Sequence, residues 1–139
     1  MADARRGTVI TVFSTASAVG KTLIGINMAA ELAKQGYRVC LVDLDLQFGD
    51  VCNYLQLQPV YTLADATKAL EREKDNFNVQ QFLTTYDRYD VPFGVLAAPL
   101  KLEEAYNLQT SDIKQIICFF QFQGCSQNSK GNIVTVIGS

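Results

Sequence analysis

Four segments of the chain are largely apolar or β-branched at successive positions, and this pattern predicts buried strands. They are Thr8–Phe13, Tyr37–Asp43, Phe93–Ala98 and Asn132–Ile137. Strands with one solvated face alternate apolar and polar residues, whereas strands that are covered on both faces are apolar throughout. We therefore expect one sheet with helices on both of its faces.

A helix is predicted between the first two strands. Apolar residues recur with a helical period from Leu23 to Lys34, and Gly36 supplies a stop signal. A strand, a helix and a strand in this order form a βαβ unit with parallel strands. The predicted fold class is α/β, with a mainly parallel sheet flanked by helices in three layers.

The middle of the chain carries signals for shorter elements. Thr62 is expected to cap a helix that runs through Leu70, with Asp65 in the capping-box position. The other predictions are a loop or short helix over Leu44–Gln58, a short helix over Val79–Thr85 capped by Asn78, a turn over Tyr86–Asp90, and a helix pair over Glu103–Leu108 and Ser111–Phe120 in which Ser111 caps the second helix.

Residues 124–139 are predicted to form a polar loop and a terminal strand, apart from the main unit of residues 1–123. Within them, Lys130–Ile137 (KGNIVTVI) resembles Arg6–Phe13 (RGTVITVF). Two explanations are open. The segment is either the beginning of an internal repeat or a second buried strand that resembles the first by chance.

Composition narrows the function classes. The chain has 139 residues, of which 48% are hydrophobic and 19% are charged, with a formal net charge of −2. These values are those of a soluble globular domain and give no reason to expect a nucleic-acid or membrane surface. Histidine is absent and the four cysteines form no C-x-x-C pair, which excludes the common zinc patterns and any His-based triad. We expect reduced thiols and a cytoplasmic protein.

The segment Thr8–Thr22 has the pattern of a phosphate-binding loop. A strand is followed by small residues, and Gly20, Lys21 and Thr22 then begin a helix. In such a loop, backbone N–H groups and the helix N-terminus face an anion, lysine adds a positive charge and the hydroxyl can hold Mg²⁺. Thr15 stands where the usual G-x-x-x-x-G-K-[ST] pattern has its first glycine, so the match is degenerate.

Two carboxylates follow the second predicted strand. Asp43 and Asp45 lie at its carboxyl end, which is where ligands bind in open α/β sheets. We therefore expect them at the same edge of the sheet as the phosphate loop. Asp50 is predicted to be a helix cap or a turn residue.

The residues over roughly Gly7 to Phe120 resemble a known family. The segments Val12–Thr22 (VFSTASAVGKT) and Val42–Asp50 (VDLDLQFGD) look like those of the MinD/ParA group of deviant-Walker P-loop ATPases, and most of all its CpaE/TadZ branch, which is associated with pilus assembly and polar localisation. Tyr61–Asp65 and Val95–Leu100 resemble the same branch. The resemblance implies a P-loop NTPase-like fold, ATP or ADP with Mg²⁺ as cofactors, a homodimer that sandwiches two ATP molecules, and protein partners in a pilus, secretion or positioning system.

The resemblance also implies roles for individual residues. Asp45 matches the carboxylate that orients the attacking water and is the catalytic candidate, while Thr22 and Asp43 would hold Mg²⁺, Asp43 through water. The nucleotide-binding candidates are Ser17, Ala18, Val19, Gly20, Lys21, Thr22 and Leu23.

This chain departs from the family pattern in two places. Ala16 stands at the position of the lysine that reaches across the dimer, and Ser17 and Ala18 replace two glycines. The Walker B aspartate is also missing, because the strand Ile133–Ile137 that could supply it ends in Gly-Ser. We therefore expect an incomplete domain that has lost the cross-dimer contribution to hydrolysis.

The predicted function is ATP binding with weak or no hydrolysis, used as a switch for dimerisation or localisation. Two alternatives from other classes are open. One is a pseudo-ATPase scaffold that binds no nucleotide, favoured by the replaced glycines. The other is an active P-loop enzyme such as a kinase or ligase, against which the segment Asp43–Gly49 (DLDLQFG) speaks.

Overall fold

A computed structural model describes residues 7–13, 20–46, 49–88, 92–122 and 130–138 of the chain. A five-stranded sheet in the order β1-β5-β2-β4-β3 forms its centre. Neighbouring strands are parallel, except that β3 runs antiparallel to β4. The strands are β1 (Thr8–Phe13), β2 (Arg38–Leu44), β3 (Thr84–Tyr86), β4 (Phe93–Leu96) and β5 (Asn132–Gly138).

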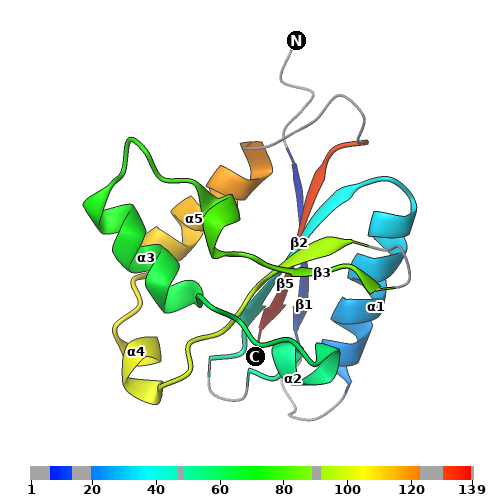
Figure 1. The fold of residues 1–139 in the computed structure, drawn as a ribbon, viewed down its shortest axis with the longest axis horizontal. Helices are drawn as coiled ribbons and strands as arrows, with labels where there is room; N and C mark the ends of the chain where they lie inside the picture. The colour runs from blue at the N-terminus through cyan, green and yellow to red at the C-terminus, as the bar shows by residue number, and fades with distance from the viewer. Residues whose placement is uncertain (1–6, 14–19, 47–48, 89–91, 123–129, 139) are drawn as a thin grey trace.

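Helices cover both faces of this sheet (Figure 1). Helices α1 (Lys21–Lys34) and α2 (Val51–Leu55) pack on one face, whereas α3 (Leu63–Arg72), the 3₁₀ helix η2 (Val79–Phe82) and α5 (Thr110–Phe122) pack on the other. Helix α4 (Leu102–Tyr106) connects β4 to α5. The predicted α/β class, with a mainly parallel sheet in three layers, is confirmed.

In the described parts of the chain, no helix combines the length and the apolar character that a bilayer span requires.

Strand β5 lies between β1 and β2 and pairs with both. Ile133 is opposite Thr8 on one side and Val39 on the other. Its side chains alternate between the two cores, with Val134 facing α3 and α5 while Ile137 faces α1. The two similar segments of the chain are therefore neighbours in the sheet, a pairing that is compatible with both explanations of their likeness.

Helix α1 packs closely against β5. A Cβ atom added to Gly25 would lie 2.7 Å from Ile137 Cδ1, so a larger residue would force the Ile137 side chain or the helix to shift. At the other end of β5, the side-chain amide of Asn132 donates hydrogen bonds to the carbonyl oxygens of Phe120 (3.0 Å) and Gln121 (3.3 Å), near the end of α5. These contacts fix both helices relative to the central strand.

Two predicted helix caps are confirmed. The Thr62 hydroxyl accepts a hydrogen bond from Ala64 N–H (3.2 Å), and Asp65 accepts one from Thr62 N–H (2.8 Å), which is the reciprocal pattern of a capping box. Asn78 accepts from Gln80 N–H (3.0 Å) at the start of η2.

Other local predictions were wrong or displaced. The helix predicted over Val79–Thr85 ends at Phe82, and the chain continues as β3, which extends through Tyr86. A three-residue edge strand carries too little periodicity to be told from a turn. Ser111 does not cap α5, because that helix already begins at Thr110. Helix α1, by contrast, begins at Lys21 directly after Gly20, as the Gly20-Lys21-Thr22 pattern predicts.

Thr135 places a hydroxyl inside the apolar core. The residue is fully buried on β5, and its Oγ1 atom has no hydrogen-bond partner among the described residues. It lies between Ile133 and Ile137, on the face covered by α1. A buried hydroxyl without a partner costs about 1–3 kcal/mol, so Thr135 is a weak point of the central strand.

We predict that Thr135→Val stabilises the protein by about 1 kcal/mol, because valine has nearly the same shape and no polar atom to desolvate. Thr67→Val is the matched control. The Thr67 hydroxyl is also buried but donates to the Ala64 carbonyl oxygen at 2.9 Å, so its loss should destabilise. Urea unfolding of the three proteins gives the free energies. Equal losses in both variants would contradict the assignment.

Candidate functional site at the carboxyl ends of β1, β5 and β2

The site begins at the N-terminus of α1. Gly20 precedes the helix with φ +79°, a left-handed conformation that glycine adopts without strain. It has no side chain to cap the helix, and the first turn contains no acidic residue. The first backbone N–H groups of the helix and its positive dipole end are therefore suited to an anion.

Lys21 forms a buried ion pair with Asp45. The lysine Nζ lies 3.4 Å from Asp45 Oδ2, and both side chains are less than a tenth exposed. Asp45 directly follows β2, so this contact joins the start of α1 to the end of that strand. The predicted phosphate-binding lysine and the predicted catalytic carboxylate are thus neighbours.

Thr22 contacts a carboxylate that the sequence did not single out for the site. Its hydroxyl donates a hydrogen bond of 3.0 Å to Asp50 Oδ1. Asp50 immediately precedes α2, as the predicted helix cap should, but its side chain makes no capping hydrogen bond and reaches to α1 instead. The only sequence signal for this role is the position of Asp50 in the loop after β2.

Asp43 holds the loop after β2 in place. It is 2% exposed, and its two carboxylate oxygens accept hydrogen bonds from Asp45 N–H (3.1 Å) and Val51 N–H (3.3 Å). Gly49 lies against this carboxylate. A Cβ added there would be 2.5 Å from Ala98 Cβ and 3.0 Å from Asp43 Oδ2, so only glycine lets the loop fold back at this point.

Burial raises the pKa of Asp43 to about 6. The backbone hydrogen bonds from Asp45 and Val51 act in the opposite direction, and the negative charges of Asp45 and Asp50 raise the pKa further. Among the causes that act on this pKa, no positive charge stabilises the ionised carboxylate. A cation or a water bound to a cation would relieve this at neutral pH.

The donors fit Mg²⁺ that arrives with a nucleotide. Mg²⁺ prefers oxygen ligands and is usually held by one or two protein oxygens together with phosphates and water. The Thr22 hydroxyl is such a ligand, and Asp43, whose oxygens already accept backbone hydrogen bonds, suits contact through water. Among the described residues no group of three or more His, Cys, Asp or Glu could hold a metal by itself.

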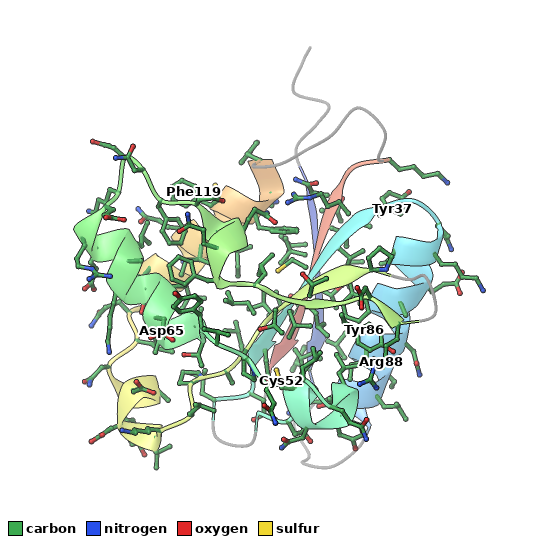
Figure 2. The ribbon with its side chains drawn as sticks, in the orientation of Figure 1. Tyr37, Cys52, Asp65, Tyr86, Arg88 and Phe119 are labelled. Atoms are coloured by element: carbon green, nitrogen blue, oxygen red, sulfur yellow. The ribbon has the colours of Figure 1, made fainter. Side chains whose placement is uncertain are left out.

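A cavity of about 430 Å³ adjoins Asp43 beside α2. Cys52, which packs between α2 and the sheet (Figure 2), lines it together with residues that follow β4. Burial, and to a smaller extent the charge of Asp43, raises the pKa of the Cys52 thiol to about 11. The thiol is protonated at neutral pH, so it is not a nucleophile here.

The structure brings together most of the predicted site residues that it describes. The start of α1 and the end of β2 meet at one edge of the sheet. Helix α1 contributes Lys21 and Thr22, and the end of β2 contributes Asp43 and Asp45. Leu23 follows them on α1 and is half exposed. Ser17, Ala18 and Val19 lie outside the described residues, as does Ala16.

The fold and the site define an α/β domain of the P-loop NTPase type. The sheet is mainly parallel, and a helix that follows Gly20 comes after the first strand. A lysine and a threonine at the start of this helix face carboxylates that follow β2. The model of the CobQ/CobB/MinD/ParA nucleotide binding domain family matches residues 10–138. The chain therefore belongs to this family.

Individual relatives agree with this assignment. The septum site-determining protein MinD of Thermotoga maritima is 43% identical over 61 residues, which are 42% of this chain and 22% of that protein. The antiactivator FleN of Pseudomonas aeruginosa is 46% identical over 57 residues, which are 41% of this chain and 20% of FleN.

A solved structure shows the same fold. MinD of Pyrococcus horikoshii, in complex with Mg-ADP, superposes with a TM-score of 0.69 at 18% identity and covers 94% of this chain. The chain spans 48% of that MinD, which is about half of its length.

The pKa of Asp43 predicts how stability depends on pH. Because the native protein binds this proton more tightly than the unfolded chain, its stability falls as pH rises from about 4 to about 6. Asp43→Asn removes the titration. Relative to the wild type, the variant should gain about 3 kcal/mol between pH 4 and pH 7, at ~1.4 kcal/mol for each pKa unit.

Urea unfolding of both proteins at several pH values measures this difference. Asp75→Asn, which removes an exposed carboxylate after α3, controls for the change in net charge. A difference between Asp43→Asn and the wild type that stays constant from pH 4 to pH 7 would contradict the prediction.

Proposed function

We propose that the chain binds ATP or ADP with Mg²⁺ at the N-terminus of α1 and acts as a switch with weak or no hydrolysis. The observation that carries the proposal is the pairing of buried Lys21 and Thr22 with the carboxylates of Asp45, which is buried, and Asp50, which is partly buried. A buried lysine beside a helix N-terminus supplies positive charge for phosphates. Membership of a nucleotide-binding domain family supports it.

In this proposal each residue has a defined task. The backbone N–H groups of Ser17 to Thr22 bind the phosphates, and Lys21 leaves Asp45 to neutralise their charge. Thr22, with Asp43 through water, would hold Mg²⁺, which when bound neutralises the phosphates and polarises them. Asp45, released from Lys21, orients water.

The finer assignment is to the CpaE/TadZ branch of deviant-Walker proteins, acting as a homodimer with protein partners in a pilus, secretion or positioning system. The segments Val42–Asp50 and Tyr61–Asp65 support this placement. The names of the relatives, a septum site-determining protein and an antiactivator, fit a regulatory switch. A cytoplasmic location is part of the same proposal.

One observation favours the second candidate, a scaffold that binds no nucleotide. Lys21 and Thr22 already have partners in Asp45 and Asp50, so the network is satisfied without a ligand. Nucleotide binding must replace the contact between Lys21 and Asp45, and the net free energy of this exchange decides between the two functions.

Calorimetry with Mg-ATP separates them. We expect the wild type to bind and Lys21→Ala to bind about 10- to 100-fold more weakly, because hydrogen bonds to charged groups contribute ~1.5–3 kcal/mol. Lys34→Ala, at the other end of α1, is the matched control and should bind as the wild type does. Absence of binding by the wild type would favour the scaffold, and equal binding by Lys21→Ala would refute this location of the site.

Hydrolysis is predicted to be weak or absent. Ala16 cannot supply the cross-dimer lysine, whose charge would act on the transferring phosphoryl group. Phosphate release from ATP by the wild type should therefore stay close to the rate without protein. Release well above that rate, and lost in Asp45→Ala, would instead identify an active ATPase with Asp45 in catalysis.

A further inference from the structure

The contact between Thr22 and Asp50 needs an explanation that helix capping does not provide. Asp50 precedes a helix of five residues, and its side chain makes no capping hydrogen bond there. The carboxylate instead accepts a hydrogen bond from a hydroxyl 28 positions earlier in the sequence. This long-range contact lies at the edge of the sheet where Lys21 and Asp45 meet.

The path of the loop places Asp50 at this position. Val51 N–H is held by Asp43 at 3.3 Å, and the residue before Asp50 is Gly49, which has no room for a Cβ atom. Asp50 lies between these two constrained residues. Its position beside Thr22 therefore follows from the packing of the loop against the sheet.

In the described structure, the other two carboxylates at this edge of the sheet have partners other than Thr22. Asp45 pairs with Lys21, and both oxygens of Asp43 accept backbone hydrogen bonds. The central strand β5 ends at Gly138, whose register partners are Phe13 and Leu44, so the described part of β5 brings no carboxylate to this edge. Asp50 is the acidic side chain that the structure pairs with the Thr22 hydroxyl.

We infer that Asp50 is a positioning residue for the magnesium-bound form of the proposed nucleotide site. By accepting the hydrogen bond from the Thr22 hydroxyl, Asp50 fixes the orientation of that hydroxyl and leaves the lone pairs of its oxygen for the ion. Outer-shell carboxylates orient metal ligands in this way and increase their basicity, and their loss typically weakens metal binding 10- to 100-fold. The inference rests on the proposed function, since Thr22 is the expected Mg²⁺ ligand.

The test measures how much Mg²⁺ strengthens ADP binding. Calorimetry with ADP in excess Mg²⁺ and in EDTA gives two dissociation constants, and their ratio is the magnesium gain. Asp50→Asn should reduce this gain about 10- to 100-fold. Its affinity for ADP in EDTA should be equal to that of the wild type or higher, because a negative charge near the phosphates has been removed.

Thr22→Val shows whether Asp50 acts through Thr22. If it does, the double variant loses no more of the magnesium gain than Thr22→Val alone, and Thr22→Ser, which keeps a hydroxyl, retains most of the gain. Thermal unfolding without ligand checks that each variant is folded. Asp75→Asn controls for the loss of one negative charge and should keep the full gain.

The outcomes separate this inference from the proposed function. Absence of ADP binding by the wild type would overturn the proposed function, and the inference with it. Normal binding with a full magnesium gain in Asp50→Asn would overturn the inference alone. Losses that add in the double variant would also overturn it, because Asp50 would then act independently of Thr22.

Discussion

Asp43 accepts hydrogen bonds from two backbone N–H groups, those of Asp45 and Val51, and the path of the chain beyond β2 depends on this pair. A buried carboxylate without such donors would be too costly to keep ionised. With them, the carboxylate holds Asp45 N–H and Val51 N–H together, Gly49 packs against Ala98, and α2 begins on the face of the sheet that α1 also covers. The side chains of Asp45 and Asp50, which follow Asp43 in the sequence, thereby reach Lys21 and Thr22 on α1.

The result is a site whose polar groups are satisfied before any ligand arrives. Lys21 pairs with the carboxylate of Asp45, and the Thr22 hydroxyl donates to that of Asp50. In the proposed function a phosphate takes the place of Asp45 beside Lys21, so nucleotide binding is an exchange of partners for this lysine. The free energy of nucleotide binding is the difference between the interactions gained and those lost. The same arrangement of side chains is therefore compatible with a nucleotide switch and with a nucleotide-free scaffold.

The sequence predicted the fold class and the meeting of Lys21, Thr22, Asp43 and Asp45, because buried strands and a glycine-lysine-threonine helix start are encoded locally. It did not predict the partners within the site. The pairing of Thr22 with Asp50 depends on the steric restriction at Gly49 and on Val51 N–H, which are properties of the folded loop. Strand β3 was missed because three residues show no period. The place of β5 in the sheet could not be derived, because the sequence of Lys130–Ile137 suits the beginning of a repeat as well as a strand of this sheet.

The strand order has a consequence for how the domain folds. Strands β1 and β2 enclose α1 in the sequence, yet in the sheet they are separated by β5, which comes from a segment much later in the sequence. Without β5, the unit of β1, α1 and β2 thus has an open place between its two strands. The lysine-bearing helix and the carboxylates at the end of β2 reach their final spacing only when β5 enters that place. Folding of the site is therefore coupled to contacts between segments that are far apart in the sequence, which slows it.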